Sequence, residues 1–81
     1  MITRTRAYDE LLDFLTSSPT PEQIVTFAPS QHTQNRLKYL LLRRRAGTIT
    51  LDERAELEEF NRVEYLMRRL IHQARKKLAP V

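Results

Sequence analysis

Residues 50–80 read TLDERAELEEFNRVEYLMRRLIHQARKKLAP, and this stretch decides the fold. Thr50 and Glu53 have the T-x-x-E spacing of a capping box, in which each side chain accepts a hydrogen bond from the other residue's backbone N–H. Neither Gly nor Pro interrupts the stretch before Pro80. We therefore predict a single helix over residues 51–78, which at 1.5 Å per residue is about 42 Å long.

An apolar stripe follows this predicted helix, because apolar residues recur at every third or fourth position. The stripe consists of Phe60, Val63, Met67, Leu70, Ala74 and Leu78, and Leu57, Leu66 and Ile71 widen it. A helix with one apolar side needs a cover for that side, either from its own chain or from a partner.

Two shorter helices are predicted near the start of the chain. The first covers residues 5–16, where apolar residues again recur every three to four positions. It ends before Pro19, because the residue that precedes a proline avoids the helical conformation. The second covers residues 21–27, since Thr20 and Gln23 have capping-box spacing around a proline suited to the first helical position.

A third helix is predicted over residues 31–46, after the N-cap Ser30 and before Gly47, which suits the left-handed conformation that ends many helices. Its inward face is expected to hold Leu37, Leu40, Leu41 and Arg44, with Tyr39 and Leu42 on the flanks. Because only residues 47–49 separate it from the long helix, the two should form an antiparallel hairpin. The sequence thus predicts an all-α fold, a small four-helix domain built on a long helical hairpin, with residues 1–81 as a single domain.

Length and composition exclude several classes of protein. The chain has 81 residues, one Gly and no Cys, which excludes a disulfide scaffold and a cysteine-ligated zinc site. No apolar run approaches the roughly 18–20 residues of a membrane span, and no apolar segment follows the first residues as in a signal peptide. We expect a cytoplasmic protein.

The charges are segregated along the chain, although the net charge is only +4. Residues 31–47 and 61–81 each carry an excess of positive charge, and residues 48–60 are acidic. Acidic residues near helix starts and basic residues near helix ends are favoured by the helix dipole, and this explanation suffices for most of the pattern. The alternative is a surface for nucleic acid or an acidic protein.

Several short motifs resemble a family of short, uncharacterised, all-helical bacterial proteins with the layout I-x-x-F-x-P-S…G-T-L-T-x-E-E-x-x-E-L…L-x-x-L-K-A-x-A-R. The matching segments are IVTFAPS at 24–30, QNRL at 34–37, LLL at 40–42, GTITLDE at 47–53, AEL at 55–57, LMRRL at 66–70 and AR at 74–75. Genes of that family often lie beside nuclease or toxin-like genes, so the resemblance implies an accessory or antitoxin-like subunit. These motifs indicate the fold of the chain, and no functional residue can be assigned from them.

The chain offers no arrangement typical of a catalytic or metal site. His32 and His72 have no acidic residue three or four positions away, which a helical metal site needs. The acidic residues 52–59 belong to the first turns of an exposed helix, whereas a general acid requires a desolvated carboxyl group in a cleft. We therefore expect a protein that is not an enzyme, with no metal, no cofactor and no small-molecule substrate.

The most favoured function is protein–protein interaction. The third helix, about 24 Å long, can cover only the first half of the long helix. The two helices near the start of the chain can fold back over some of the remaining apolar residues, and a partner would cover the rest. The expected partner-binding residues are Phe60, Val63, Met67, Leu70, Ile71, Ala74, Arg68, Arg69 and Arg75, and Arg43, Arg44 and Arg45 add to the charged rim. The partner would be another protein or a second copy of the chain.

The alternative function is a small DNA- or RNA-binding regulator. Segment 21–45 has the spacing of a helix-turn-helix, and its second helix begins with side chains able to reach bases or phosphates. The candidate nucleic-acid contacts are Gln31, Gln34, Asn35, Arg36, Lys38, Arg43, Arg44 and Arg45. The turn lacks the usual glycine, and the helix becomes apolar early. A membrane-surface helix over residues 68–78 is disfavoured, because it has no Trp anchor.

Overall fold

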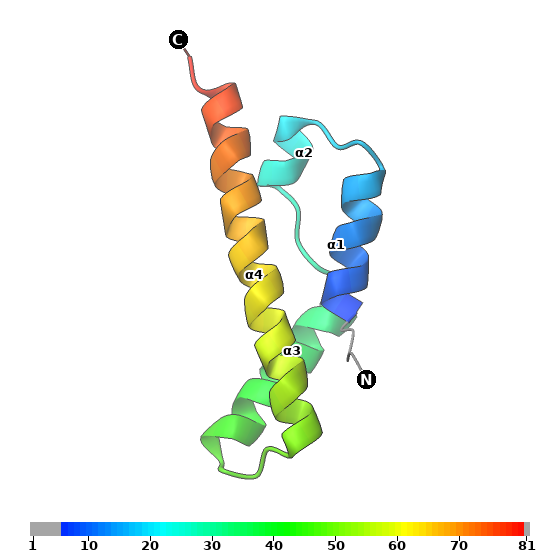
Figure 1. The fold of residues 1–81 in the computed structure, drawn as a ribbon, viewed down its shortest axis with the longest axis vertical. Coiled ribbons are helices and arrows are strands. Elements are labelled where there is room, and N and C mark those ends of the chain that lie inside the picture. Colours follow the sequence, from blue (N-terminus) through cyan, green and yellow to red (C-terminus); the bar gives the residue numbers. More distant parts are fainter. Residues whose placement is uncertain (1–5, 81) are drawn as a thin grey trace.

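The computed structural model describes residues 6–80, and this range contains four α-helices and no strand. The helices are α1 (Arg6–Thr16), α2 (Pro21–Val25), α3 (Gln31–Arg45) and α4 (Leu51–Leu78). The molecule is elongated, measuring 50 × 24 × 21 Å, and α4 runs along its whole length (Figure 1). The predicted all-α class is confirmed, and α4 is a single unbroken helix with the predicted ends.

The predicted helix starts are confirmed by their hydrogen bonds. At α4 the Thr50 backbone N–H donates to Glu53 Oε1 at 3.0 Å, and the Glu53 N–H donates to Thr50 Oγ1 at 3.1 Å. Thr20 and Gln23 form the same reciprocal pair at the start of α2, at 2.9 and 3.2 Å. α2 ends at Val25, which is earlier than predicted, because the backbone leaves the helical conformation before Pro29.

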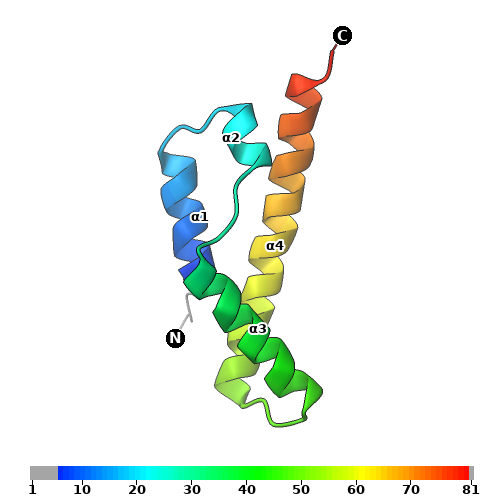
Figure 2. The ribbon, with the colours of Figure 1, turned by 180° about the vertical axis from the view of Figure 1, so that it is seen from behind.

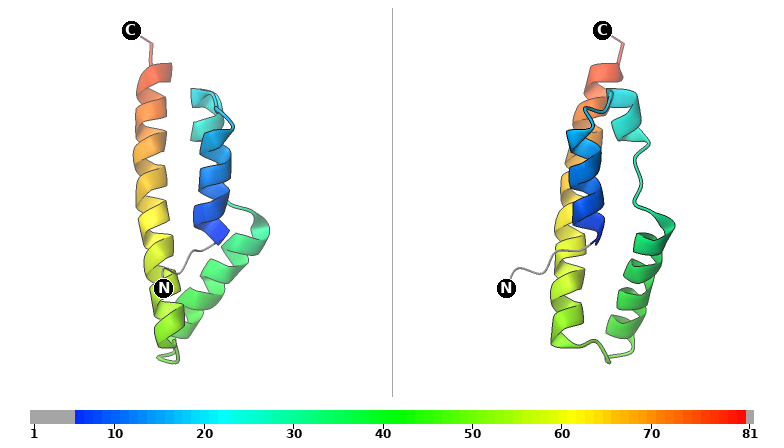
Figure 3. Two further views of the ribbon diagram at one scale, coloured as in Figure 1. Left: turned by 45° about the vertical axis from the view of Figure 1, so that its right-hand side comes forward. Right: turned by 90° about the vertical axis from the view of Figure 1, so that its right-hand side faces the viewer.

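The hairpin of α3 and α4 is closed at its turn and open at its other end. Gly47 has a φ of +73°, as expected for the residue that ends α3. Beside the turn, Arg43 Nε lies 3.3 Å from Glu53 Oε1, and its Nη2 donates to the Thr48 carbonyl at 2.8 Å. The start of α3 diverges from α4, and the first turn of α1 lies in the opening (Figures 2 and 3).

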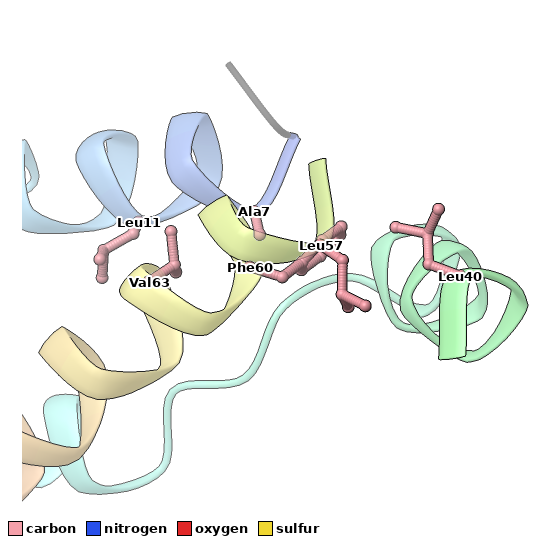
Figure 4. Packing of buried hydrophobic residues seen from close by; sticks show 6 residues of the cluster. All are labelled: Ala7, Leu11, Leu40, Leu57, Phe60 and Val63. Carbon is pink, nitrogen blue, oxygen red and sulfur yellow. The ribbon is translucent and has the colours of Figure 1, made fainter. Parts of the chain in front are cut away.

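The core lies where α1, α3 and α4 meet, and six side chains form it. They are Ala7, Leu11, Leu40, Leu57, Phe60 and Val63 (Figure 4). Burying a side chain of Leu, Val or Phe size stabilises a fold by about 1.5–3 kcal/mol, so this small cluster is the main source of stability.

Above the core, α1 and α2 lie along the second half of α4, which α3 does not reach (Figures 1 and 3). The rings of Phe14 and Phe27 stack there with their centroids 4.3 Å apart. Together with Leu11 and Ile24 they pack near Leu70 of α4. The chain itself therefore supplies the cover that the length of α4 demands.

The inward face of α3 differs from the predicted one. Thr33 and Leu40 are 2% and 0% exposed, and Leu37 is partly buried against the core. Leu41 is 38% exposed and Arg44 is also exposed, so both were wrongly assigned to the inward face. Each helical residue turns by about 100°, so Leu41 is rotated away from the side on which Leu40 contacts α4. Arg44, four residues after Leu40, lies on nearly the same side as Leu40, but it belongs to the last turn of α3 and its side chain stays exposed.

Candidate interaction surfaces

The apolar stripe of α4 is largely used inside the monomer, which corrects its assignment as a partner-binding surface. Phe60, Val63 and Ala74 are 7%, 4% and 3% exposed, so a partner cannot reach them while the domain is folded. The remaining apolar members, Met67, Leu70 and Ile71, are partly buried. The stripe is buried because α1 and α2 return along α4 and cover it.

The charged residues predicted beside the stripe remain at the surface. Arg68, Arg69 and Arg75 are all exposed on α4. The Arg69 guanidinium lies 5.9 Å from the centroid of the Tyr65 ring, and Arg69 Nη1 donates to Tyr65 Oη at 3.5 Å. A shallow hollow on this side of α4 is lined by Tyr65, Arg68, Arg69, His72, Gln73 and Lys76. These residues all belong to one helix, so the hollow is a surface feature and not an enclosed cavity.

The predicted helix-turn-helix is not formed. α2 has only five residues, and it packs against α4 and makes no comparable contact with α3. The intervening residues 26–30 instead lead the chain from one end of α4 toward the middle (Figure 3). In a helix-turn-helix the first helix braces the second, so segment 21–45 cannot present α3 to a DNA groove in that way.

Five of the eight predicted nucleic-acid contacts are engaged in hydrogen bonds or ion pairs within the domain. Arg36 forms a bidentate ion pair with Glu56, with Nε and Nη2 each 2.8 Å from a carboxylate oxygen. This pair links α3 to α4. The hydrogen bond from Arg36 to Glu56 also raises the pKa of the guanidinium. Arg43 pairs with Glu53 at the turn. Gln34 donates to the Pro29 carbonyl at 2.7 Å. Gln31 donates to Asn35 Oδ1 at 2.9 Å on the outside of α3.

The other three basic residues of α3 face solvent. Lys38, Arg44 and Arg45 are exposed, and within residues 6–80 they form no ion pair. Lys38 and Arg45 lie beside Leu41 and Leu42, and these four side chains line a shallow, mainly apolar depression on the outer face of α3.

Sequence reasoning missed this outer face of α3 as a candidate surface. Leu42 is 62% exposed and Leu41 38% exposed, although Leu41 was predicted on the inward face and Leu42 on its flank. A signal was present, because Lys38, Leu42 and Arg45 are spaced four and three residues apart and so share one side of a helix. That side is opposite the buried Leu40.

The electrostatics of the structure mainly stabilise helix starts. Burial raises the pKa of Glu10, but hydrogen bonds from Thr33 and Ser30 and the charge of Arg6 outweigh it, so the pKa lies below its ordinary value. The Thr50 backbone N–H, which donates to the Glu53 carboxylate, lowers the pKa of that group, and Arg43 adds to the effect.

A further hollow, of about 190 Å³, lies between α1, Pro29, α3 and α4. Its lining is mostly apolar, from core residues such as Leu37, Phe60 and Met67, and Glu64 is its single acidic residue. Among the described residues, no three His, Asp or Glu side chains are grouped closely enough to hold a metal ion.

Comparisons with known proteins indicate no function, so the proposals below are based on the exposed surfaces of the domain. No protein-family model, curated protein or solved structure matches the chain. None of the helices in residues 6–80 is long and apolar enough to cross a lipid bilayer.

Proposed function

We propose that the protein is a non-catalytic protein-binding module that docks an amphipathic helix of a larger partner onto the outer face of α3. The observation that carries this proposal is the exposure of Leu42 and Leu41 between Lys38 and Arg45. Leucines held in water on a rigid helix gain free energy when a partner covers them, at about 25 cal/mol per Å² of apolar area.

The structure around α3 supports a preformed docking surface. Leu40 and Thr33 anchor one side of the helix in the core, and the Arg36–Glu56 and Arg43–Glu53 ion pairs hold it to α4. A partner can therefore bind the opposite side of α3 without breaking the contacts that hold this helix in the domain. A rigid surface loses little conformational entropy on binding, which favours affinity.

The charges of this face favour an acidic partner helix. Lys38 and Arg45 flank the leucines. Glu or Asp residues beside the apolar positions of a partner helix would complement them. A second copy of the chain fits less well, because a two-fold contact through this face would bring like charges together. An accessory or antitoxin-like role, which the family resemblance implies, requires a binding partner of this kind.

The proposal is tested by comparing two charge-introducing variants in partner capture. Leu42→Glu places a carboxylate in the docking face, and Leu66→Glu makes the same change on α4, where Leu66 is 44% exposed. We expect tagged wild type and Leu66→Glu to retain the same partner and Leu42→Glu to lose it. A photo-crosslinking residue at position 42 should then attach to an acidic amphipathic helix of that partner.

Two results would contradict the proposal. Capture of the same proteins by Leu42→Glu and wild type would show that the α3 face is not the docking surface. Light scattering that reports a dimer for wild type and a monomer for Leu42→Glu would assign the face to self-association.

A further inference from the structure

The outward face of α4 between Tyr65 and Lys76 carries positive charge that the fold does not use. Its hollow is lined by Tyr65, Arg68, Arg69, His72, Gln73 and Lys76, all of them exposed. The chain has no Asp or Glu after Glu64. Within the described residues, none of these cations is in an ion pair. The whole charge of this face is therefore available to a ligand.

The cations are arranged in rows along a straight helix. Arg62, Arg69 and Lys76 are spaced seven residues apart, and so are Arg68 and Arg75. Seven residues make nearly two turns, so members of one row emerge from almost the same side at intervals of about 10 Å. Such rows match an extended polyanion better than a compact anion, which would need several cations to converge on one point.

Tyr65 adds an aromatic ring to this basic face. The side chain is 57% exposed, and the ring is not packed into the core. Arg69 lies over the ring, at 5.9 Å from its centroid, and holds it beside the cations. Cations that follow a backbone, together with an aromatic ring on which a base stacks, are the usual components of a single-strand binding surface.

The surroundings of this face disfavour a membrane as the ligand. A basic helix binds an anionic membrane by inserting its apolar side. In α4 that side is occupied by the core contacts of Phe60, Val63 and Ala74. An acidic protein would use the cations but would leave the ring of Tyr65 without a stacking partner.

We infer that the outward face of α4 binds single-stranded nucleic acid, with its arginines and Lys76 on phosphates and Tyr65 beneath a base. This surface is separate from the outer face of α3, so the inference does not depend on the proposed docking function.

The test is fluorescence anisotropy with a labelled oligothymidylate and the matching oligouridylate. The double variant Arg69→Gln/Lys76→Gln removes two cations from the face, and Arg44→Gln/Arg54→Gln removes the same charge from exposed positions elsewhere. For single strands log K falls with log[salt] by about 0.7 per phosphate contact, which corresponds to about an eightfold loss per contact at about 50 mM salt. We expect the affinity for the oligonucleotides to fall about sixtyfold in the first variant and much less in the second. Only the first variant should show a shallower dependence of affinity on salt.

Tyr65 is tested by two substitutions that leave the charge unchanged. Tyr65→Phe keeps the ring and should bind as wild type, whereas Tyr65→Ala should bind several-fold more weakly. Because Tyr65 is exposed, neither change should alter the circular dichroism spectrum. The docking variant Leu42→Glu should bind the oligonucleotides like wild type, which separates this test from that of the proposed function.

Three results would overturn the inference. The first is equal weakening by the two double variants, because it would indicate a general effect of net charge. The second is tighter binding of a duplex than of either single strand. The third is binding to vesicles of anionic phospholipid without binding to the oligonucleotides.

Discussion

The carboxylate of Glu10 on α1 accepts a hydrogen bond from the buried hydroxyl of Thr33, 23 residues further along the chain in α3. The same carboxylate accepts hydrogen bonds from the Ser30 N–H at 2.7 Å and the Ser30 Oγ at 3.3 Å. A negative charge is thereby placed at the start of α3, where the helix dipole favours it. One side chain thus caps a helix to which it does not belong and joins α1 to α3.

Removing this contact should destabilise the fold. Glu10→Ala leaves the Ser30 N–H and the Thr33 hydroxyl without their charged acceptor, and we expect the free energy of unfolding to fall by about 2 kcal/mol. The control Asp13→Ala removes an exposed carboxylate from the same helix and should change the free energy of unfolding by less than about 0.5 kcal/mol. Urea denaturation followed by circular dichroism measures both values. Equal losses would show that Glu10 acts only through the charge of α1.

The stability of the domain should depend on pH through the same residue. The pKa of Glu10 is lower in the folded protein than its ordinary value of 4.5. Its stabilising contribution is therefore complete above the unfolded-state pKa and is lost as the pH falls through the folded-state pKa. Glu10→Gln should be less stable than wild type at neutral pH, and the difference should shrink as the solution is acidified below about pH 4. Urea midpoints over this range test the expectation, and a constant difference would contradict it.

Two turn positions should respond to substitution with opposite signs. Gly47 has a φ of +73°, and a Cβ added there would meet no atom within 4 Å, whereas Ser18 has a φ of +58°. Because a left-handed conformation strains a residue with a Cβ, Gly47→Ala should lower the free energy of unfolding by about 0.5–1 kcal/mol. Ser18→Gly should raise it by about 0.5 kcal/mol, since relief of strain exceeds the added entropy of the unfolded chain. Thermal unfolding distinguishes the two signs, and shifts in the same direction would refute the expectation.

The distinction between core and surface apolar residues can be measured directly. Phe60 is 7% exposed in the core, so Phe60→Ala should cost about 3–5 kcal/mol and leave the domain largely unfolded. Leu42 is 62% exposed, so Leu42→Ala should change the stability by less than about 0.5 kcal/mol. Thermal melts monitored by circular dichroism give both values. If Phe60→Ala is as stable as wild type, Phe60 is not a core residue and is again a candidate for binding a partner.

The helices could be predicted from the sequence because their signals are local. Thr50 with Glu53 and Thr20 with Gln23 each mark a helix start within four residues, and both pairs make the expected hydrogen bonds. Proline and glycine positions then bounded the helices to within about two residues. The candidate surfaces were harder to predict, because Leu40, Leu41 and Leu42 are alike in sequence and differ only in which one faces α4.

The sequence by itself determined four helices, their caps and the unbroken length of α4, since each depends on interactions between residues three or four positions apart. Only the tertiary structure decided which faces remain free. The path of residues 26–30 carries α3 away from α2, which removes the helix-turn-helix, and the return of α1 and α2 covers the stripe of α4 (Figure 1). Those placements depend on contacts between residues far apart in the chain, such as Glu10 with Thr33 and Phe14 with Phe27, and no local pattern encodes them.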